Sequence, residues 1–593
     1  MACRGASPGD FPVPVNRNPG ISVTPAVQPI DLETPAPGRA RFALRPFVRA
    51  FFRRPGVSRA VTVLAAVFLF AALIFPNVVS RLTPLGFLRI PVEGAVVIAL
   101  MLVLPVRARR VAAVVLGVLI GWLVLEKCLD MGFFAELNRP FDPVLDWVLF
   151  DDAYGFAAEA YGRVAAAGAV VAVVLLVGSV MALTVWSLLR VGALIGRQRR
   201  RSAMTAGAVA VAWAVTFGLG VSITGAVPVA ARSTATYAWD RAHQARAGLR
   251  DEAAFASEVG QDAYGKTPAQ QMLTALRGKD VIFTFVESYG RSAVEHPALA
   301  GQVDPVLDQG TRTLREAGFA SRSGWLTSPT FGGGSWLAHS TFESGLWINN
   351  EQRYRNLVSS NRLTLTRAFK DAGWRTVSVM PGATRAWPEG RFYGYDQVWD
   401  SRNLGYRGPK FSWAPMPDQY TLHRLNTIEY RKPGRGPLMI EMPLVSSHTP
   451  WAPIPSYLPD WDQVGDGSVY HAMVANGQKP KALWAEPRKV RPEYGRSIQY
   501  TITTLVNWMR LYGDDNLVMV FLGDHQPSPI AAGADAGHDV PISIVAKDPA
   551  VLDRIAGWGW TDGLRPASSA PVWPMSQFRD RFLAAFGPPA PAS

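Results

Sequence analysis

The sequence predicts a chain in two parts: an α-helical membrane domain with five spans, followed by an α/β domain with a mostly parallel sheet. Apolar residues make up 49% of the 593 residues and charged residues 18%, and the long apolar runs all lie before residue 231. After residue 276, short β-rich segments alternate with helical patterns, which is typical of α/β domains. This composition excludes a disordered or fibrous protein.

The membrane domain is predicted over residues 59–230. Its apolar runs cover 59–79, 90–105, 111–125, 165–189 and 203–230. The first, fourth and fifth are long enough to cross a hydrocarbon core of about 30 Å, whereas the two shorter runs also suit a re-entrant hairpin or one kinked span. Glu93 lies inside the second run. An ionisable residue there is a functional candidate, although its place near one end also lets it reach the interface.

Charge asymmetry predicts the orientation in the membrane. Residues 1–230 hold 22 Lys and Arg against 12 Asp and Glu, and the remainder holds 38 against 34. Arginines gather before the first run and in two later connections, whereas the 126–164 loop is mainly acidic. The positive-inside rule then places the N-terminus in the cytoplasm and residues 231–593 outside. Residues 1–58 are predicted to be a disordered basic tail, and the arginine pattern suits membrane topology rather than a nucleic-acid partner.

The outer part divides into a connecting helical linker, 231–275, and an extracellular α/β domain, 276–593. The predicted strands are 280–286, 375–380, 437–446, 516–522 and 540–546, and the helices are about 304–317, 361–373, 494–512 and 574–586. Buried strands joined by helices indicate a parallel sheet, and ligands bind at the carboxyl ends of such strands. The two cysteines are Cys3 and Cys128, so this part has no disulfide framework and no cysteine-based site.

Three of the predicted strands are followed by ionisable side chains. Glu287 follows the first strand, Asp524 and His525 follow the strand at 516–522, and His448 follows the strand at 437–446. Each also suits a structural role, as a helix cap, a turn residue or an interface histidine. Because the carboxyl ends of parallel strands meet at one edge, we expect the four side chains to lie together.

A triple glycine, 332–334, precedes Ser335 and a helical pattern that ends near Gly345. Ser335 is therefore expected at or next to a helix N-cap, where exposed N–H groups and the helix dipole favour an anion. Such a serine suits attack on a phosphoryl group, and a plain capping serine is the alternative. The glycines do not form a P-loop, because the Gly-Lys-Ser/Thr that would follow is missing.

The candidate metal ligands combine oxygen and nitrogen donors: Glu287, Ser335, Asp524 and His525. This set suits Mn²⁺, Mg²⁺ or Zn²⁺ and excludes soft-metal chemistry. A cation next to the serine oxygen would lower the pKa of the hydroxyl and neutralise phosphate oxygens. His448 could then contact the phosphate or protonate the leaving group.

Five spans, an outer α/β domain and the motifs VES (286–288), GGGS (332–335) and GDHQP (523–527) resemble the lipoteichoic acid synthase family of phosphoglycerol transferases. That family lies within the alkaline phosphatase/sulfatase superfamily, and the resemblance covers nearly all of the chain beyond residue 55. It implies one divalent metal, Mn²⁺ before Mg²⁺ or Zn²⁺, held by the four ligands named above. It also implies Ser335 as nucleophile, where the family has threonine, and His448 on the substrate side.

Further contacts follow from the same resemblance. Trp387 and Arg391, in MPGATRAWPEGRFYGYD, match the family's substrate-contacting Trp and Arg in type, with wider spacing. His538, in GHDVPISIVAKDP, matches a phosphate-side position. The implied activity is transfer of a phosphoalcohol group, phosphoglycerol-like, from a membrane phospholipid to a glycan or glycolipid of the cell envelope through a phospho-Ser. Together with the bias toward Arg, Ala and Val, it implies a multi-pass protein of a bacterial cell membrane.

Other functions stay open at this point. A metal-dependent phosphodiesterase or sulfatase-like hydrolase would use the same residues, and a scaffold with this fold would be a non-enzymatic alternative. Formylglycine formation needs Cys/Ser-x-Pro-x-Arg, whereas Trp336, Leu337, Ala338 and His339 follow Ser335. A phosphoethanolamine transferase is a further alternative, although the outer domains of that group usually carry disulfides.

Overall fold

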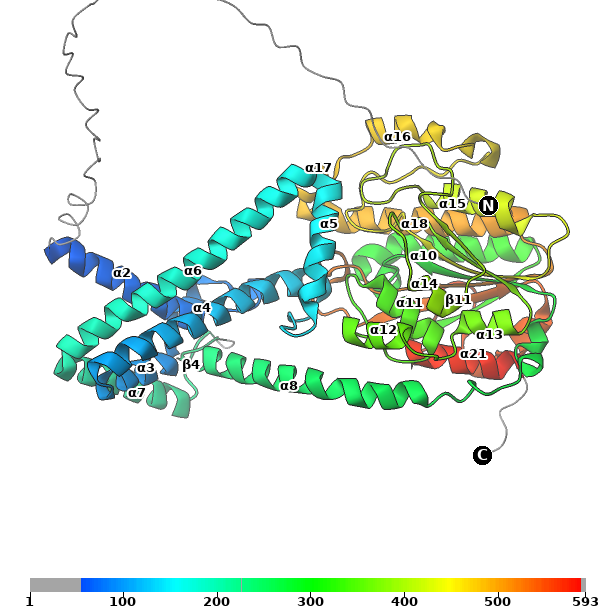
Figure 1. The fold of residues 1–593 in the computed structure, drawn as a ribbon. Coiled ribbons are helices and arrows are strands. Elements are labelled where there is room, and N and C mark those ends of the chain that lie inside the picture. The colour runs from blue at the N-terminus through cyan, green and yellow to red at the C-terminus, as the bar shows by residue number, and fades with distance from the viewer. Residues whose placement is uncertain (1–54, 225–226, 588–593) are drawn as a thin grey trace, which may run out of the picture. The chain divides into compact units, whose positions relative to one another are not determined.

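The computed structural model describes residues 55–224 and 227–587. The predicted tail, 1–58, therefore lies outside the described residues except for its last four. Figure 1 shows the helical N-terminal region (residues 55–224 and 227–231), the long helix α8 (Ser233–Gly260) and the α/β domain. Helix α8 covers residues 233–260 of the predicted linker, 231–275, and the domain bounds stay a prediction.

Each predicted apolar run lies at least partly in a helix. The helices are α2 (Pro55–Ile74), α3 (Val92–Val103), α4 (Val106–Leu137), α6 (Arg163–Arg197) and α7 (Arg199–Gly218). Of the described helices, α2, α4 and α6 are long and apolar enough to cross a membrane. The short α3 has 12 residues, and three arginines open α7 and shorten its apolar stretch. The count of five spans stays a prediction.

The acidic stretch after residue 126 is mostly helical, whereas the sequence predicted a loop there. Helix α4 runs on to Leu137, and α5 covers Leu149–Tyr161. The buried charge of Asp130 is accommodated because it is paired: Asp130 accepts hydrogen bonds from Arg241 Nη2 at 2.7 Å and the Tyr237 hydroxyl at 3.0 Å. Buried charges are tolerated only with such partners.

Glu93 has a structural role at a helix start. Its Oε1 accepts hydrogen bonds from the backbone N–H groups of Thr234, at 3.1 Å, and Ala235, at 3.0 Å. These two residues lie in the first turn of α8, where N–H groups have no partner within the helix. A carboxylate at this point also interacts favourably with the helix dipole.

The α/β domain is built on a nine-stranded sheet with the order β12-β6-β11-β10-β5-β9-β7-β8, and β13 also pairs with β6. The strands are β5 (Asp280–Val286), β6 (Ala320–Thr327), β7 (Arg375–Met380), β8 (Gln397–Asp400), β9 (Leu438–Leu444), β10 (Leu517–Gly523), β11 (Asp539–Ala546), β12 (Thr561–Asp562) and β13 (Val572–Pro574). Strands β10, β5, β9, β7 and β8 are parallel, whereas β11 pairs antiparallel with β10 and β6. The predicted mostly parallel sheet is confirmed.

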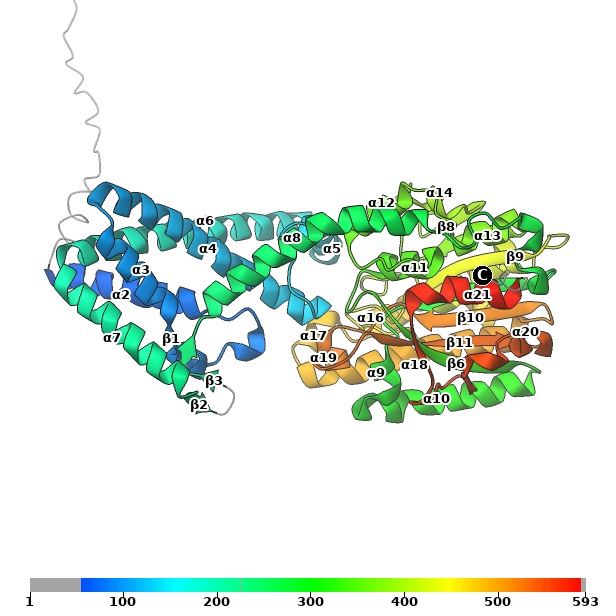
Figure 2. The ribbon, with the colours of Figure 1, turned by 90° about the horizontal axis from the view of Figure 1, so that it is seen from below.

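Helices cover both faces of the sheet. Helices α10 (Pro297–Glu316) and α18 (Pro487–Tyr512) lie together on one face, and α11 (Ser335–Ser344), α13 (Leu365–Asp371) and α21 (Phe578–Phe586) lie on the other (Figures 1 and 2). A hydrophobic core lies on each face of the sheet. Adjacent residues of β5 pack in different cores, since side chains alternate along a strand. Ile282 packs in the core that holds Leu307 and Ile502, and Phe283 packs in the core that holds Phe342.

Strand register shows where the three central strands end. Val286, the last residue of β5, lies opposite Gly523 of β10 and Leu444 of β9. The three strands therefore end level with one another. Whatever follows them in the sequence emerges at a single edge, which is where ligands bind in parallel sheets.

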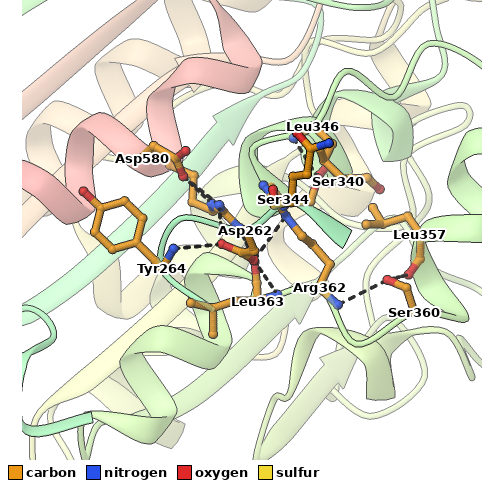
Figure 3. Close-up of polar contacts among 12 residues, drawn as sticks. Asp262, Tyr264, Ser340, Ser344, Leu346, Leu357, Ser360, Arg362, Leu363 and Asp580 are labelled. Carbon is orange, nitrogen blue, oxygen red and sulfur yellow. Dashed lines mark hydrogen bonds and ion pairs between the residues drawn. The ribbon is translucent and has the colours of Figure 1, made fainter. Parts of the chain in front are cut away.

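An ion-pair network holds the C-terminal end of helix α11 (Figure 3). Asp262, just after α8, pairs with Arg579 of α21 at 2.9 Å and with Arg362 at 3.3 Å. Arg362 also donates to the carbonyl of Ser344, the last residue of α11, at 3.0 Å. The Arg579 side chain is fully buried, and Asp580, at 2.7 Å, is its second carboxylate partner.

Candidate active site

The ionisable residues predicted to lie together do so at the carboxyl ends of β5, β10 and β9. One carboxylate oxygen of Glu287, one of Asp524 and a ring nitrogen of His525 all lie within 4.8 Å of one another. All three residues are buried. Strand β9 is tied to the same edge, because the Ser447 hydroxyl donates to the Glu287 carbonyl at 2.6 Å. His448 follows directly.

Ser335 is the first residue of α11, and Gly334 is the N-cap, with a φ of 79°. That left-handed conformation suits glycine and turns the chain into the helix. The Ser335 hydroxyl donates to Glu287 Oε2 at 3.1 Å and lies 3.2 Å from His525 Nε2. The loop and helix start thus place this hydroxyl against the carboxylate and imidazole cluster.

The residues present fit a divalent cation. Asp524 Oδ1 accepts backbone hydrogen bonds from Ser288, at 2.7 Å, and His525, at 2.8 Å. Its other oxygen, Oδ2, is buried without a hydrogen-bond partner in the described part of the chain. Such an oxygen is costly unless it has a ligand. His525 Nδ1 lies 2.8 Å from the Gln526 carbonyl, so in the neutral imidazole Nδ1 carries the proton and Nε2 has a lone pair facing the cluster.

The electrostatics of the cluster also favour a bound cation. Burial and the nearby carboxylate of Glu287 raise the pKa of Asp524 to about 6. Burial disfavours the charged form of His525, but the carboxylates of Asp524 and Glu287 outweigh it and raise the pKa of that imidazole. Two carboxylates in a buried space disfavour each other's ionisation. A cation among the four side chains relieves this repulsion, and oxygen with imidazole donors suits Mn²⁺, Mg²⁺ or Zn²⁺.

A cavity of about 330 Å³ lies beside Ser335, and aromatic side chains form part of its lining. Trp336, Trp387, Trp413 and Tyr393 line it, together with His448. The His448 ring stacks on Trp413 with centroids 3.7 Å apart, and its Nδ1 lies 2.5 Å from the Thr449 carbonyl. Burial lowers the pKa of His448 to about 4, so the imidazole is neutral at pH 7.

Among the predicted substrate contacts, the structure places Trp387 in this cavity, with Nε1 3.4 Å from the Tyr354 hydroxyl. Arg391 is exposed on α14 (Gly390–Tyr393) and does not line the cavity. His538 lies just before β11, with Nδ1 3.3 Å from the Ser328 carbonyl, and does not line it either. Substrate contacts by Arg391 and His538 stay predictions.

Glu441 and His339 also line the cavity, and the sequence analysis did not identify them. Glu441 lies in β9, where its Oε2 accepts a hydrogen bond from the Tyr395 hydroxyl at 2.5 Å. Its Oε1 lies 3.6 Å from Nδ1 of His339, one helical turn after Ser335. Burial and the neighbouring Glu343 raise the pKa of Glu441 well above its ordinary value. A single acid in the apolar run LMIEMPL was the available signal.

The class of domain is now defined by fold and site together. Residues 279–543 match the model of the sulfatase family, as the resemblance predicted. No curated protein matches the sequence.

Several solved structures are similar to part of the chain. The lipoteichoic acid synthase LtaP from Listeria monocytogenes is 15% identical, with 46% of this chain and 66% of that chain covered and a TM-score of 0.33. The Streptococcus pyogenes phosphoglycerol transferase GacH, in complex with sn-glycerol-1-phosphate, is 13% identical over 56% and 91%, with a TM-score of 0.34. The soluble domain of lipooligosaccharide phosphoethanolamine transferase A from Neisseria meningitidis is 12% identical over 54% and 93%, with a TM-score of 0.35. The chain spans just under two thirds of the Listeria protein.

Proposed function

We propose that this chain is a membrane-bound, metal-dependent phosphotransferase. It moves a phosphoalcohol group from a phospholipid to a hydroxyl of a cell-envelope glycan or glycolipid outside a bacterial cell. The observation that carries the proposal is the Ser335 hydroxyl, 3.1 Å from Glu287 Oε2 and 3.2 Å from His525 Nε2, at the start of a helix. A hydroxyl so placed is a nucleophile for a phosphorus centre.

The reaction takes two displacements. Ser335 Oγ attacks the phosphorus of the lipid; the Oγ–P bond forms, and the bond from phosphorus to the glycerol oxygen of diacylglycerol breaks. The proton lost by Ser335 reaches that oxygen, and diacylglycerol leaves. The acceptor hydroxyl oxygen then attacks the phosphorus of the phospho-Ser; the new oxygen–phosphorus bond forms and the Oγ–P bond breaks. The acceptor's proton returns to Ser335 Oγ, and the phosphoalcohol is left on the acceptor. Neutral His448, which lines the cavity, contacts the phosphate or passes the proton.

Glu287, Ser335, Asp524 and His525 are the residues that would hold the metal, with Mn²⁺ as our first choice and Mg²⁺ or Zn²⁺ as alternatives. When bound, a divalent cation neutralises phosphate oxygens and favours the deprotonated serine. The chain's own contribution is orientation. Ser288 N–H and His525 N–H fix one oxygen of Asp524, and the Gln526 carbonyl fixes the His525 ring. Such supporting contacts set ligand geometry.

A lipid donor is supported by two features of the chain. Three helices before the α/β domain are apolar and long enough to cross a membrane, so the domain would stay near lipid headgroups. The cavity beside Ser335 has aromatic walls, which suit a substrate with apolar surface.

The test uses full-length protein in liposomes with headgroup-labelled phospholipid, Mn²⁺ and a glycan acceptor. We expect release of diacylglycerol and transfer of the label to the acceptor, neither of which occurs with Ser335→Ala. Label that appears only as a free phosphoalcohol would identify a hydrolase instead. Absence of diacylglycerol with Mn²⁺, Mg²⁺ and Zn²⁺ alike would contradict the proposal.

A further inference from the structure

A second cavity, of about 570 Å³, lies in the helical N-terminal region and is rich in arginine. It is formed by the connection between α2 and α3, the end of α7 and the start of α8. Arg81, Arg89 and Arg232 line it, and the lining includes one carboxylate, that of Asp240. None of the three guanidinium groups forms an ion pair with a carboxylate within residues 55–224 and 227–587. With three guanidinium groups against one carboxylate, the lining of the cavity carries a net positive charge, although Glu93 also acts on Arg89.

The arginines come from separate segments and converge on this space. Arg89 Nε donates to the Pro228 carbonyl at 3.2 Å, which fixes the side chain. Burial and the neighbouring charge of Arg81 lower the pKa of Arg89, so the two cations destabilise each other. Arg232 lies over the Phe217 ring, with its Cζ 6.0 Å from the ring centroid. Planar guanidinium groups bind phosphate with paired hydrogen bonds, so an anion of this kind would relieve the repulsion.

Uncharged polar groups complete the lining. Asn77, Thr216, Ser233 and Thr236 face the same cavity. The Ser233 hydroxyl is buried and has no hydrogen-bond partner among the described residues. A buried hydroxyl without a partner is unusual in a folded protein, and a ligand oxygen would satisfy it.

The rim of the cavity is apolar. Phe217 and Val221 line it and are 54% and 41% exposed. On the same helix, α7, the side chains of Val211 and Val215 are 63% and 51% exposed, as is 75% of Leu219 just beyond its end. A free phosphate ion would make no apolar contacts with these side chains. A phospholipid would, because its acyl chains lie next to its phosphate.

We propose that this cavity binds the headgroup of an anionic phospholipid, with the acyl chains along α7. The site is separate from the catalytic cavity, because neither Ser335 nor the carboxylate and imidazole cluster contributes to it. It does not depend on the proposed transferase activity. A lipid bound here would join the end of α7 to the first turn of α8 and so stabilise the start of the helix that leads to the α/β domain.

The test titrates delipidated full-length protein in detergent with phosphatidylglycerol or phosphatidylcholine, with bound lipid counted by native mass spectrometry. We expect phosphatidylglycerol to bind about 10-fold more tightly than phosphatidylcholine. The triple variant Arg81→Gln, Arg89→Gln, Arg232→Gln should lose at least about 10-fold in affinity for phosphatidylglycerol. The matched control, Arg107→Gln, Arg110→Gln, Arg200→Gln, removes three exposed charges of the same region and should bind like the wild type.

Three results would overturn the proposal. Equal affinity of the triple variant and the wild type for phosphatidylglycerol would show that the three arginines do not bind the lipid. Equal losses in the triple variant and its control would indicate non-specific surface charge. Full displacement of the lipid by millimolar inorganic phosphate would indicate a site for the free ion. If the triple variant does not fold, Arg81→Gln alone decides, because Arg81 is exposed; unchanged affinity there would also contradict the proposal.

Discussion

The hydroxyl oxygen of Ser335 lies 3.2 Å from Nε2 of His525, although 190 residues separate the two in the sequence. The contact arises because α11 begins at the edge of the sheet where β10 ends. It places a nucleophile candidate in direct contact with a metal-ligand candidate. Substitutions around this pair should therefore separate loss of metal from loss of chemistry.

Asp524→Asn should lower the metal content of the purified protein and reduce turnover by at least about 10-fold. The substitution keeps the shape of the side chain but removes the charge of the carboxylate whose Oδ2 has no hydrogen-bond partner in the described structure. Metal analysis by mass spectrometry and a turnover assay measure the two effects. Asp515→Asn, at a side chain 91% exposed, is the matched control and should change neither. Retained metal and full activity in Asp524→Asn would remove Asp524 from the site.

His448→Gln should lower turnover by about 100-fold with metal content unchanged, because His448 is expected to serve the substrate rather than the metal. Trp413→Phe should cost less than His448→Gln, since an aromatic ring can still stack on the imidazole. Rates of single-turnover diacylglycerol release would compare the variants. Wild-type rates in His448→Gln would show that this histidine has no part in the reaction.

Glu441→Gln should make the stability of the protein less sensitive to alkaline pH. Burial and Glu343 raise the pKa of Glu441 above its ordinary value of 4.5, so the folded protein binds this proton more tightly than the unfolded chain. The resulting stabilisation is complete below about pH 4.5 and is lost as the pH rises through the elevated pKa. Each pKa unit of elevation corresponds to about 1.4 kcal/mol.

Melting temperatures at pH 5 and pH 8 measure this effect. The wild type should lose more stability than Glu441→Gln between the two values, and Glu316→Gln, at an exposed position, should behave like the wild type. Parallel losses in wild type and Glu441→Gln would show that the Glu441 carboxyl does not titrate differently in the folded and unfolded states.

Reporter fusions test the predicted topology. A fusion at residue 195 should report a cytoplasmic position, and fusions at 145 and 260 should report external positions, because arginines flank the first site and acids flank the second. The structure adds that residue 195 lies near the end of α6 and residue 260 at the end of α8. A cytoplasmic signal at 260 would contradict the five-span arrangement.

The central strands could be predicted from the sequence because they are buried on both faces. DVIFTFV and RTVSVM correspond to β5 and β7 residue for residue, and the other three predicted strands differ from β9, β10 and β11 by at most two residues at either end. Strand β6, ASRSGWLT, was not predicted, because it carries no continuous apolar run. Its polar side chains are satisfied by tertiary contacts, such as Ser323 with Ser543 at 2.7 Å, which no local pattern reveals.

The residues of the candidate site also divide into those that the sequence could predict and those that it could not. Residues that directly follow buried strands, such as Glu287 and Asp524, could be predicted because parallel strands end at one edge. Glu441 and His339 could not, since one lies inside a strand and the other inside a helix, and only the packing of α11 on the sheet brings both into the cavity. The acidic part of α4 was predicted as a loop because its charges are paired with residues about 110 positions later, such as Asp130 with Arg241.

The most direct measurement of the central claim is mass spectrometry of the enzyme trapped with a phospholipid. We expect a phosphoalcohol adduct on Ser335, no turnover in Ser335→Ala with metal largely retained, and partial activity in Ser335→Thr, which keeps a hydroxyl. Normal turnover of Ser335→Ala, or an adduct on Thr330 or Ser340 instead, would contradict the assignment of Ser335 as the nucleophile.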